Sequence, residues 1–180
     1  VILTGGIDLS VGAVMALVGT VVAGLMVNSG LPAGLALPLG LALGLGIGLF
    51  NGFLVAWGRM PAIIVTLATM GMARGTALIY SGGYPISGIP SWISWFGVGR
   101  VGIVPVPVII MVLIYALAWI LLQRTAFGRH VYALGGNETA ARLSGVKTRR
   151  VKLAVYAISG LTSSLAAVIL TGRLMSGQPN

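Results

Sequence analysis

Five long apolar segments dominate the pattern of hydrophobic and polar positions along the 180-residue chain. They cover approximately residues 9–27, 33–57, 62–80, 104–122 and 153–171. A helix of about 20 mostly apolar residues is long enough to cross a bilayer. The pattern therefore predicts an all-α fold, a polytopic bundle of about five transmembrane helices that forms a single transmembrane domain over residues 1–180.

The composition narrows the class further. Hydrophobic residues make up 57% of the chain and charged residues only 7%, which excludes both a soluble enzyme and a disordered chain. The chain has no cysteine, so thiolate metal sites, disulfides and cysteine nucleophiles are excluded. The 11 Lys and Arg residues against two Asp and Glu indicate basic loops at a cytoplasmic membrane face, next to anionic lipids, rather than a nucleic-acid partner.

The basic residues also predict an orientation. Seven of the 11 cations lie in the loop 123–152, which the positive-inside rule places in the cytoplasm. Counting spans back from that loop puts Arg59 on the same side and the turn 28–32 outside. The stretch 81–102 also falls outside and reads as an exposed loop, with Trp92 and Trp95 forming an interfacial patch.

Four glycines recur at every fourth position of the second segment, at residues 40, 44, 48 and 52. Residues at this spacing share one helix face, and small side chains there let a second helix approach closely. The stripe predicts helix packing, with a pore-lining role as the alternative. We expect this helix in the protein interior rather than facing lipid.

Asp8 is the most unusual residue of the first segment, because it follows Gly5-Gly6 and precedes Ser10 at the start of an apolar helix. One interpretation is a chain break at residues 5–10 followed by a helix whose N-terminal N–H groups the carboxylate caps. The other is a half-helix that begins inside the membrane and lines a polar solute path with Asp8 and Ser10.

The third segment carries the other candidate path residues. Arg74-Gly75 interrupts its apolar run, so either Arg74 extends to the outer interface or the helix is broken at 74–75. Thr66 and Thr69 share a face and could offer hydroxyls to a polar solute, although such hydroxyls more often bond to their own helix backbone.

Enzyme chemistry has no evident basis in the sequence. His130 and the carboxylates of Asp8 and Glu138 are far apart, so no catalytic triad, carboxylate pair or metal site is expected. A phosphate-binding loop of the GxxxxGK[ST] type is absent, and no cofactor is predicted. If ATP supplies the energy, a separate chain must hydrolyse it.

The basic loop contains a predicted short helix over residues 138–144. Asn137 suits its N-cap, Glu138 its positive end, Arg142 its last turn and Gly145 its terminus. About two turns are marginal in isolation, so a partner protein is expected to receive this helix on a small-residue surface. The alternative is a solvated basic loop that contacts lipid phosphates. The candidate docking residues are Asn137, Glu138, Thr139, Ala140, Ala141, Arg142, Leu143, Ser144 and Gly145.

Several long motifs resemble one family. They are GGIDLSVG at 5–12, PAIIVTL at 61–67, RG at 74–75, FGRHVYALGGN at 127–137, TGRL at 171–174 and SGQPN at 176–180. In order and over the whole chain, they are similar to the permease subunits of ribose-type, simple-sugar ATP-binding cassette importers. Both ends of the chain lie within this similarity, so we expect the chain to be an internal piece of a longer membrane protein.

The resemblance implies a set of partners and a location. Such permeases act as dimers in the cell inner membrane, with cytoplasmic ATP-binding subunits and a periplasmic or extracellular sugar-binding protein. It also implies that residues 137–145 are the coupling helix that docks into the ATPase. The polar residues singled out above as candidates for a solute path, Asp8, Ser10, Thr66, Thr69 and Arg74, are then expected to lie along the sugar pathway.

Three other functions stay open at this point. The first is a branched-chain amino acid permease of the same broad class. The second is an ion-driven secondary transporter or channel, although Asp8 and Arg74 are its only intramembrane ionisable candidates. The third is a membrane scaffold that does not transport, for which the glycine face would be enough.

Overall fold

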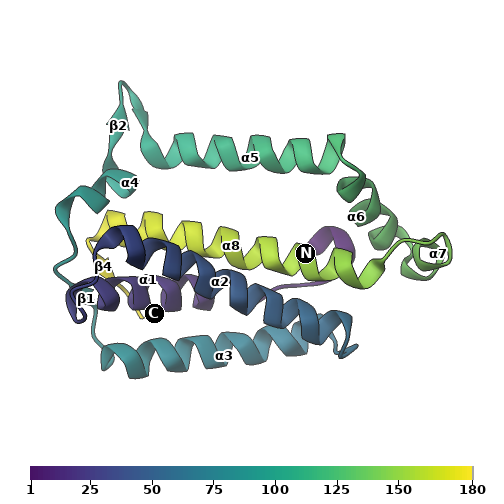
Figure 1. Cartoon of the computed structure of the whole chain (residues 1–180), viewed down its shortest axis with the longest axis horizontal. Helices are drawn as coiled ribbons and strands as arrows, with labels where there is room; N and C mark the ends of the chain where they lie inside the picture. Colours follow the sequence, from purple (N-terminus) through teal and green to yellow (C-terminus); the bar gives the residue numbers. More distant parts are fainter. Residues whose placement is uncertain (180) are drawn as a thin grey trace.

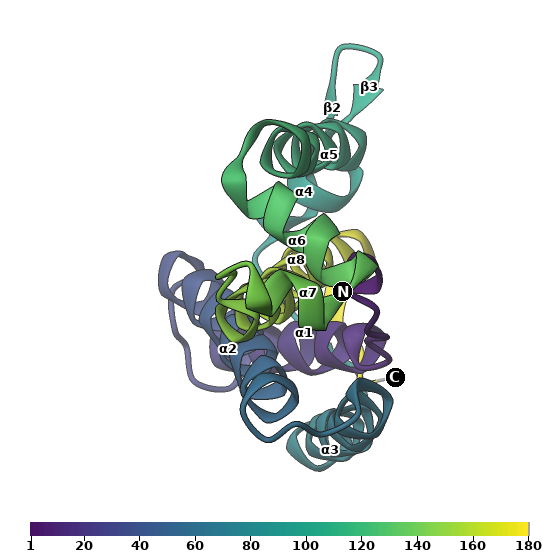
Figure 2. The same cartoon turned by 90° about the vertical axis from the view of Figure 1, so that its right-hand side faces the viewer.

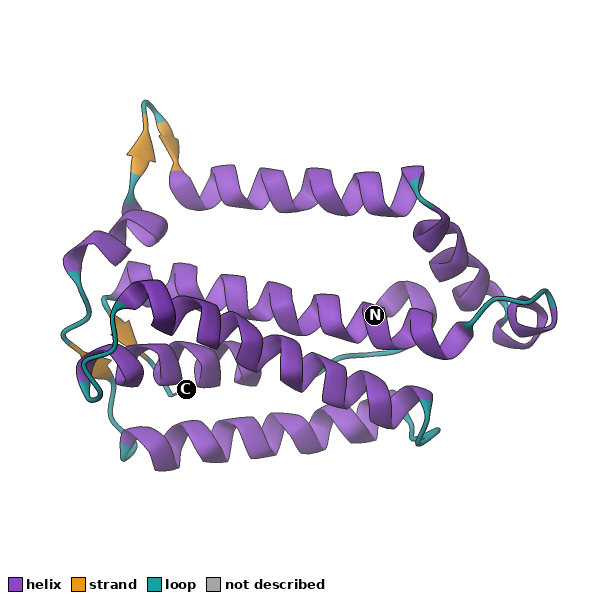
Figure 3. Cartoon of the chain, viewed as in Figure 1, coloured by secondary structure: helices purple, strands orange, loops and turns teal. Residues whose placement is uncertain are grey.

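Five long helices lie roughly parallel to one another in the computed structural model, which describes residues 1–179 (Figures 1 and 3). Four of them are long and apolar enough to cross a membrane, whereas the first, with 17 residues, is shorter. The prediction of an all-α polytopic membrane bundle is confirmed. The long helices are α1 (Val11–Val27), α2 (Ala33–Ala56), α3 (Ala62–Ser81), α5 (Val106–Arg124) and α8 (Thr148–Leu174).

Short elements connect the long helices and occupy both ends of the bundle. Antiparallel β1 and β4 pair Ile86 with Gly177, and β2 and β3 pair Arg100 with Pro105. The predicted loop 81–102 is thus partly structured. The short elements are a 3-10 helix (Ile2–Thr4), β1 (Ile86–Ser87), a second 3-10 helix (Ser91–Ile93), α4 (Ser94–Val98), β2 (Arg100–Val101), β3 (Val104–Pro105), α6 (Ala126–Gly136), α7 (Glu138–Leu143) and β4 (Ser176–Gly177).

Helix α1 is the inner helix of the bundle. It packs against α2, α3 and α8, and ten of its 17 residues are buried. Val14, Val18 and Val22 form the centre of the main hydrophobic core. The prediction that α2 would be the interior helix is therefore wrong in this chain, because α2 buries one face and leaves large apolar side chains such as Phe50 and Phe53 exposed.

The glycine stripe of α2 does form a helix–helix contact, as predicted. Gly44 packs against Gly160 and Ser164 of α8, and Gly48 packs against the backbone of Tyr156. A side chain at either glycine would overlap α8, so the two backbones can approach only because both helices carry small residues here. This contact is the most extensive between any two elements of the described chain.

Helix α5 stands apart from the other four long helices (Figure 2). Its only buried residue is Val106, at the end where α4 meets it. The rest of its surface is apolar and exposed, including Leu117 and Trp119. Such a surface suits lipid or protein rather than water.

The two predicted chain breaks have different outcomes. Residues 5–10 are not helical, and Gly5 adopts a left-handed φ of 74°, so a break precedes α1 as predicted. The break at 74–75 is wrong, because α3 continues from Ala62 to Ser81. A single glycine costs a helix only about 1 kcal/mol, and the exposed side chain of Arg74 can extend outward without interrupting it.

Candidate functional site

Asp8 lies in the non-helical segment that leads into α1, and its carboxylate is held on both sides. Oδ1 accepts hydrogen bonds from the backbone N–H of Ser10 at 3.0 Å and from its hydroxyl at 2.6 Å. Oδ2 accepts a hydrogen bond from the hydroxyl of Ser159 in α8 at 2.7 Å. The carboxylate thereby joins the break to a helix that begins some 140 residues later in the sequence.

The hydrogen bonds continue from Ser10 into the bundle. The amide Nδ2 of Asn51 in α2 donates to the Ser10 hydroxyl at 3.2 Å, and the Thr69 hydroxyl of α3 donates to Asn51 Oδ1 at 2.6 Å. Ser10, Asn51 and Thr69 are all buried. The polar chain, as we call Ser159, Asp8, Ser10, Asn51 and Thr69, therefore links α8, the break, α2 and α3.

The expected capping role of Asp8 is only partly present. The N–H that it binds belongs to Ser10, the residue before the first helical position, and no side chain caps the first turn of α1. Thr66 agrees only in part with the expectation that its hydroxyl bonds to its own helix backbone. Its hydroxyl bonds to Ala62 of its own helix at 2.9 Å, but it also reaches the carbonyl oxygen of Ile7 in the break at 3.2 Å.

Arg74 lies apart from the polar chain. It lines a separate hollow of about 230 Å³ between α1, α3 and α8, together with Thr171, Ser176 and Gln178. The Gln178 amide donates to the Ser176 hydroxyl at 2.8 Å. The last residue of the SGQPN motif, Asn180, lies outside the described residues. The structure therefore brings four of the five predicted path residues to the break region and places Arg74 elsewhere.

Sequence reasoning missed two members of the polar chain, Asn51 and Ser159. Asn51 was detectable, because it is the only amide within the second apolar segment. Ser159 was not, since the fifth segment carries several serines and threonines, and only the packing of α8 shows which of them faces Asp8.

Helix α7 forms where the short helix was predicted, one residue shorter. The side chain of Asn137 accepts a hydrogen bond from the Ala140 N–H at 2.9 Å, and Gly145 follows the helix with a left-handed φ of 86°. Both termini thus carry the predicted residues. Helix α6 was missed, although Phe127, Val131 and Leu134 recur at the spacing of one helix face and could have revealed it.

One expected feature of α7 is wrong. Ala141 is buried against the rest of the chain, so it cannot belong to an exposed docking surface. Glu138 forms an ion pair with Lys152 of α8 at 2.8 Å, because the start of α8 passes within reach of the carboxylate. The exposed apolar residue of α7 is Leu143, whose exposed fraction is 82%.

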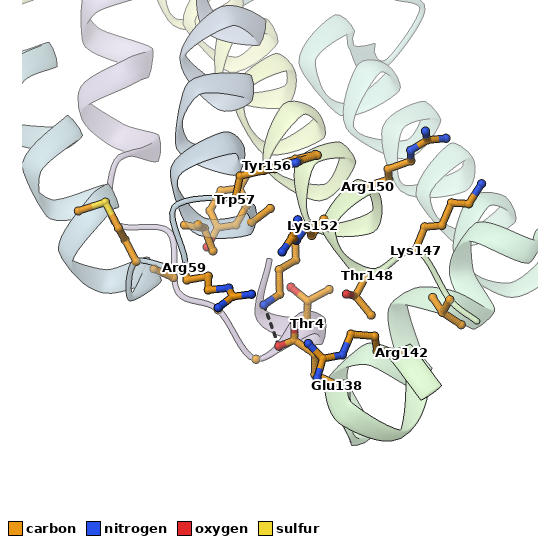
Figure 4. Close-up of a pocket in the computed structure, with 18 of the residues that line it drawn as sticks. Thr4, Trp57, Arg59, Glu138, Arg142, Lys147, Thr148, Arg150, Lys152 and Tyr156 are labelled. Atoms are coloured by element: carbon orange, nitrogen blue, oxygen red, sulfur yellow. Dashed lines mark hydrogen bonds and ion pairs between the residues drawn. The ribbon is translucent and has the colours of Figure 1, made fainter. Parts of the chain in front are cut away.

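A large basic bowl opens at the same end of the molecule as α7 (Figure 4). Its volume is about 990 Å³, and its wall combines the start of the chain, the turn between α2 and α3, α7 and the first residues of α8. One acidic residue, Glu138, faces six cations. These cations are Arg59, Arg142, Lys147, Arg149, Arg150 and Lys152.

This fold and these sites define a multi-pass α-helical membrane protein with a polar chain inside its bundle. The chain belongs to the family described as the branched-chain amino acid transport system permease component, which matches residues 1–180.

Several relatives with curated names are named as sugar permeases. The ribose import permease RbsC of Bacillus subtilis is 51% identical over 99% of this chain and 56% of its own length. RbsC of Escherichia coli K12 is 46% identical over 99% of this chain and 57% of its own length. The D-allose transport system permease AlsC of the same strain is 39% identical over 99% of this chain and 55% of its own length. The chain thus spans about half the length of these relatives. No solved structure matches it.

Proposed function

We propose that the protein is the transmembrane permease subunit of an ATP-binding cassette importer for a monosaccharide of the ribose type. The observation that carries this proposal is the 51% identity to a ribose import permease over nearly the whole chain. The branched-chain amino acid alternative has only the family's description in its favour, whereas the ribose and allose permeases are named for sugars.

The residues proposed for the sugar pathway are Asp8, Ser10, Thr66, Thr69 and Arg74. Polar groups inside a membrane bundle are costly and lie where they face one another or a water-filled cavity. A non-helical segment at membrane depth is tolerated under the same condition. The break at residues 5–10, with its hydroxyl and carboxylate groups, meets that description. Arg74 and the hollow beside it would belong to the opposite, outer half of the route.

Energy coupling is assigned to α7 and its flanking residues 137–145. In this proposal the protein itself does not hydrolyse ATP, and a cytoplasmic ATP-binding subunit receives α7 through the exposed side chains around Leu143. The loop 123–152 then lies in the cytoplasm and the protein in the cell inner membrane. A second permease copy and a sugar-binding protein outside the membrane complete the transporter.

Uptake by the complete transporter tests the assignment. Labelled ribose should enter cells in an ATP-dependent manner, excess ribose or allose should compete, and excess leucine should not. Competition by leucine would favour an amino acid permease instead. Uptake that persists after ATP depletion and stops with a proton uncoupler would favour an ion-driven transporter.

Asp8→Asn tests the pathway within the same assay. Asn caps a helix about as well as Asp, so a capping role alone predicts unchanged uptake. Loss of the charged acceptor of three hydrogen bonds should instead reduce uptake about tenfold. The amount of transporter in the membrane should stay near normal, and it serves as the internal control.

A further inference from the structure

The basic bowl carries a large excess of positive charge. Five of its six cations lie within residues 142–152, in α7 and around the start of α8, and the sixth, Arg59, comes from the distant turn after α2. Only one ion pair, between Glu138 and Lys152, offsets this charge within the described residues. Like charges gathered around one cavity repel one another, so an anion bound there would relieve the repulsion.

We propose that this bowl is a binding site for a phosphate group, contributed either by the headgroup of an anionic phospholipid or by a free phosphate compound of the cytosol. The proposal concerns binding alone, and it does not depend on which solute the protein transports.

The centre of the site is formed by Arg59, Arg142 and Lys152. Figure 4 shows their charged groups converging around Glu138, whereas Lys147 and Arg150 extend away from the centre. Two guanidinium groups and an ammonium from different walls suit a phosphate, because several of its oxygens can accept charge-assisted hydrogen bonds at the same time.

Thr148 supplies an independent indication of a ligand. It lines the bowl, its exposed fraction is only 6%, and its hydroxyl oxygen is drawn toward the centre of the cavity. None of the hydrogen bonds among residues 1–179 uses this hydroxyl. Thr148 is also the first residue of the 27-residue helix α8, whose first turn has no side-chain cap. The positive end of that helix therefore adds to the attraction for an anion.

The position of the bowl agrees with either source of phosphate. It opens where α2 ends and α3 and α8 begin, and Trp57, which is partly exposed, lies on its wall. Tryptophan is enriched at headgroup depth in membrane proteins, so a lipid phosphate can reach this wall from the side. The cavity is also open, so a compound from solution can enter it.

A phosphate at this position would connect α7 to the bundle. Arg142 belongs to α7, whereas Arg59 belongs to the turn between α2 and α3 and Lys152 to α8. Without a ligand, α7 contacts the bundle through the partly exposed Glu138–Lys152 pair and through buried Ala141. Exposed ion pairs contribute at most about 1 kcal/mol, so a ligand that binds both sides would hold α7 more firmly.

The test is the retention of ligand by the purified protein without any ATPase or sugar-binding protein. The protein in neutral detergent is incubated with phosphatidylglycerol, with phosphatidylcholine, or with inorganic phosphate as a competitor, and bound lipid is counted by native mass spectrometry. Phosphatidylglycerol should be retained in preference to phosphatidylcholine. Arg59→Gln should weaken its binding about tenfold, as expected for the loss of a charged hydrogen-bond donor.

Matched variants separate the site from general surface charge. Arg100→Gln removes one cation at the opposite end of the molecule and should leave lipid retention unchanged. Thr148→Val should weaken binding, and Thr148→Ser, which keeps the hydroxyl, should restore it. All variants must keep the melting temperature of the lipid-free protein, which shows that they are folded.

A lipid headgroup and a free phosphate compound give different results in this test, and both results differ from those that overturn the proposal. Displacement of the lipid by millimolar phosphate assigns a site open to the cytosol, and retention despite phosphate assigns a lipid headgroup. Equal lipid binding by Arg59→Gln, Arg100→Gln and the unmodified protein overturns the proposal. It is also overturned if neither probe binds and the bowl becomes protected only when the ATPase is added, because an acidic protein surface is then its ligand.

Discussion

The carboxylate of Asp8 accepts three hydrogen bonds, and none of the donors carries a charge. The donors of the polar chain all point toward this carboxylate: Thr69 donates to Asn51, Asn51 to Ser10, and Ser10 to Asp8. Hydrogen bonds in such a series polarise one another, and each is strengthened when water is excluded. Asn51 is the residue on which the series depends, because its donor binds Ser10 of the break and its acceptor binds Thr69 of α3.

A double-mutant cycle should expose this dependence. Asn51→Ala leaves the buried Thr69 hydroxyl without its acceptor, and Thr69→Ala leaves the amide oxygen of Asn51 without its donor. Each change should destabilise the protein by about 1–3 kcal/mol. The double variant should lose clearly less than the two single losses added together, since its second change removes a group that is already unpaired.

Chemical denaturation in detergent micelles provides the measurement. Thr76→Ala is the control for Thr69→Ala, because Thr76 lies two turns along the same helix and is exposed. Strict additivity in the cycle would show that Asn51 and Thr69 are neighbours without energetic coupling.

At the scale of helices, the contact between α2 and α8 rests on the absence of side chains. Gly48→Leu would place a side chain into the backbone of Tyr156, so the helices would have to separate. Overpacking of this kind costs about 1–3 kcal/mol or more, and here it also opens the polar chain beside the contact. We expect a lower melting temperature and poor recovery of folded protein.

Gly46→Leu is the matched control on the same helix. A Cβ atom at Gly46 meets no other atom within 4 Å, and leucine is a better helix former than glycine. This variant should be as stable as the unmodified protein or slightly more so. If both leucine variants lowered the melting temperature equally, the glycine stripe would matter for helix flexibility rather than for packing.

The exposed side of α7 makes Leu143, rather than one of the alanines of this helix, the position to change. Ala141 is buried, so Ala141→Trp would displace α7 itself and would not report on docking alone. Leu143 is 82% exposed, and Leu143→Glu should abolish most co-purification with the proposed ATPase while leaving the melting temperature unchanged. Ile103→Glu makes the same exchange at a site that is 94% exposed at the other end. It should not affect co-purification, and equal losses in both variants would exclude α7 as the docking element.

These elements also show how far the sequence could be interpreted. Apolar length alone located all five long helices, because a bilayer-spanning helix must be apolar over most of its surface. The ends of α7 were predictable, because the Asn137 side chain can accept a hydrogen bond from the first turn and the left-handed backbone after the helix favours glycine at Gly145. The inward side of α7 was not predictable, because it depends on where α8 passes. The sequence left open whether Arg74-Gly75 breaks the third segment, because a continuous helix tolerates both residues.

For the whole molecule, the structure separates two chemically different ends. The turn between α2 and α3, α7 and the basic bowl lie at one end, and β1, α4 and the β2–β3 hairpin lie at the other (Figure 1). The end with the bowl carries most of the cations, which is the distribution that the positive-inside rule links to the cytoplasm. The path of the chain agrees with this orientation. Because α2 and α3 run in opposite directions, the turn between them lies at the same end as the basic bowl.

Single cysteines test this orientation cleanly, because the chain has none of its own. Ser87 in β1 and Ser144 beside α7 are both exposed and lie at opposite ends. On intact cells with a permeable outer envelope, a membrane-impermeant maleimide should label Ser87→Cys and leave Ser144→Cys unlabelled. After the inner membrane is opened, both should react, which shows that each thiol is accessible. Labelling of Ser144→Cys alone on intact cells would invert the orientation, and α7 could then no longer meet a cytoplasmic ATPase.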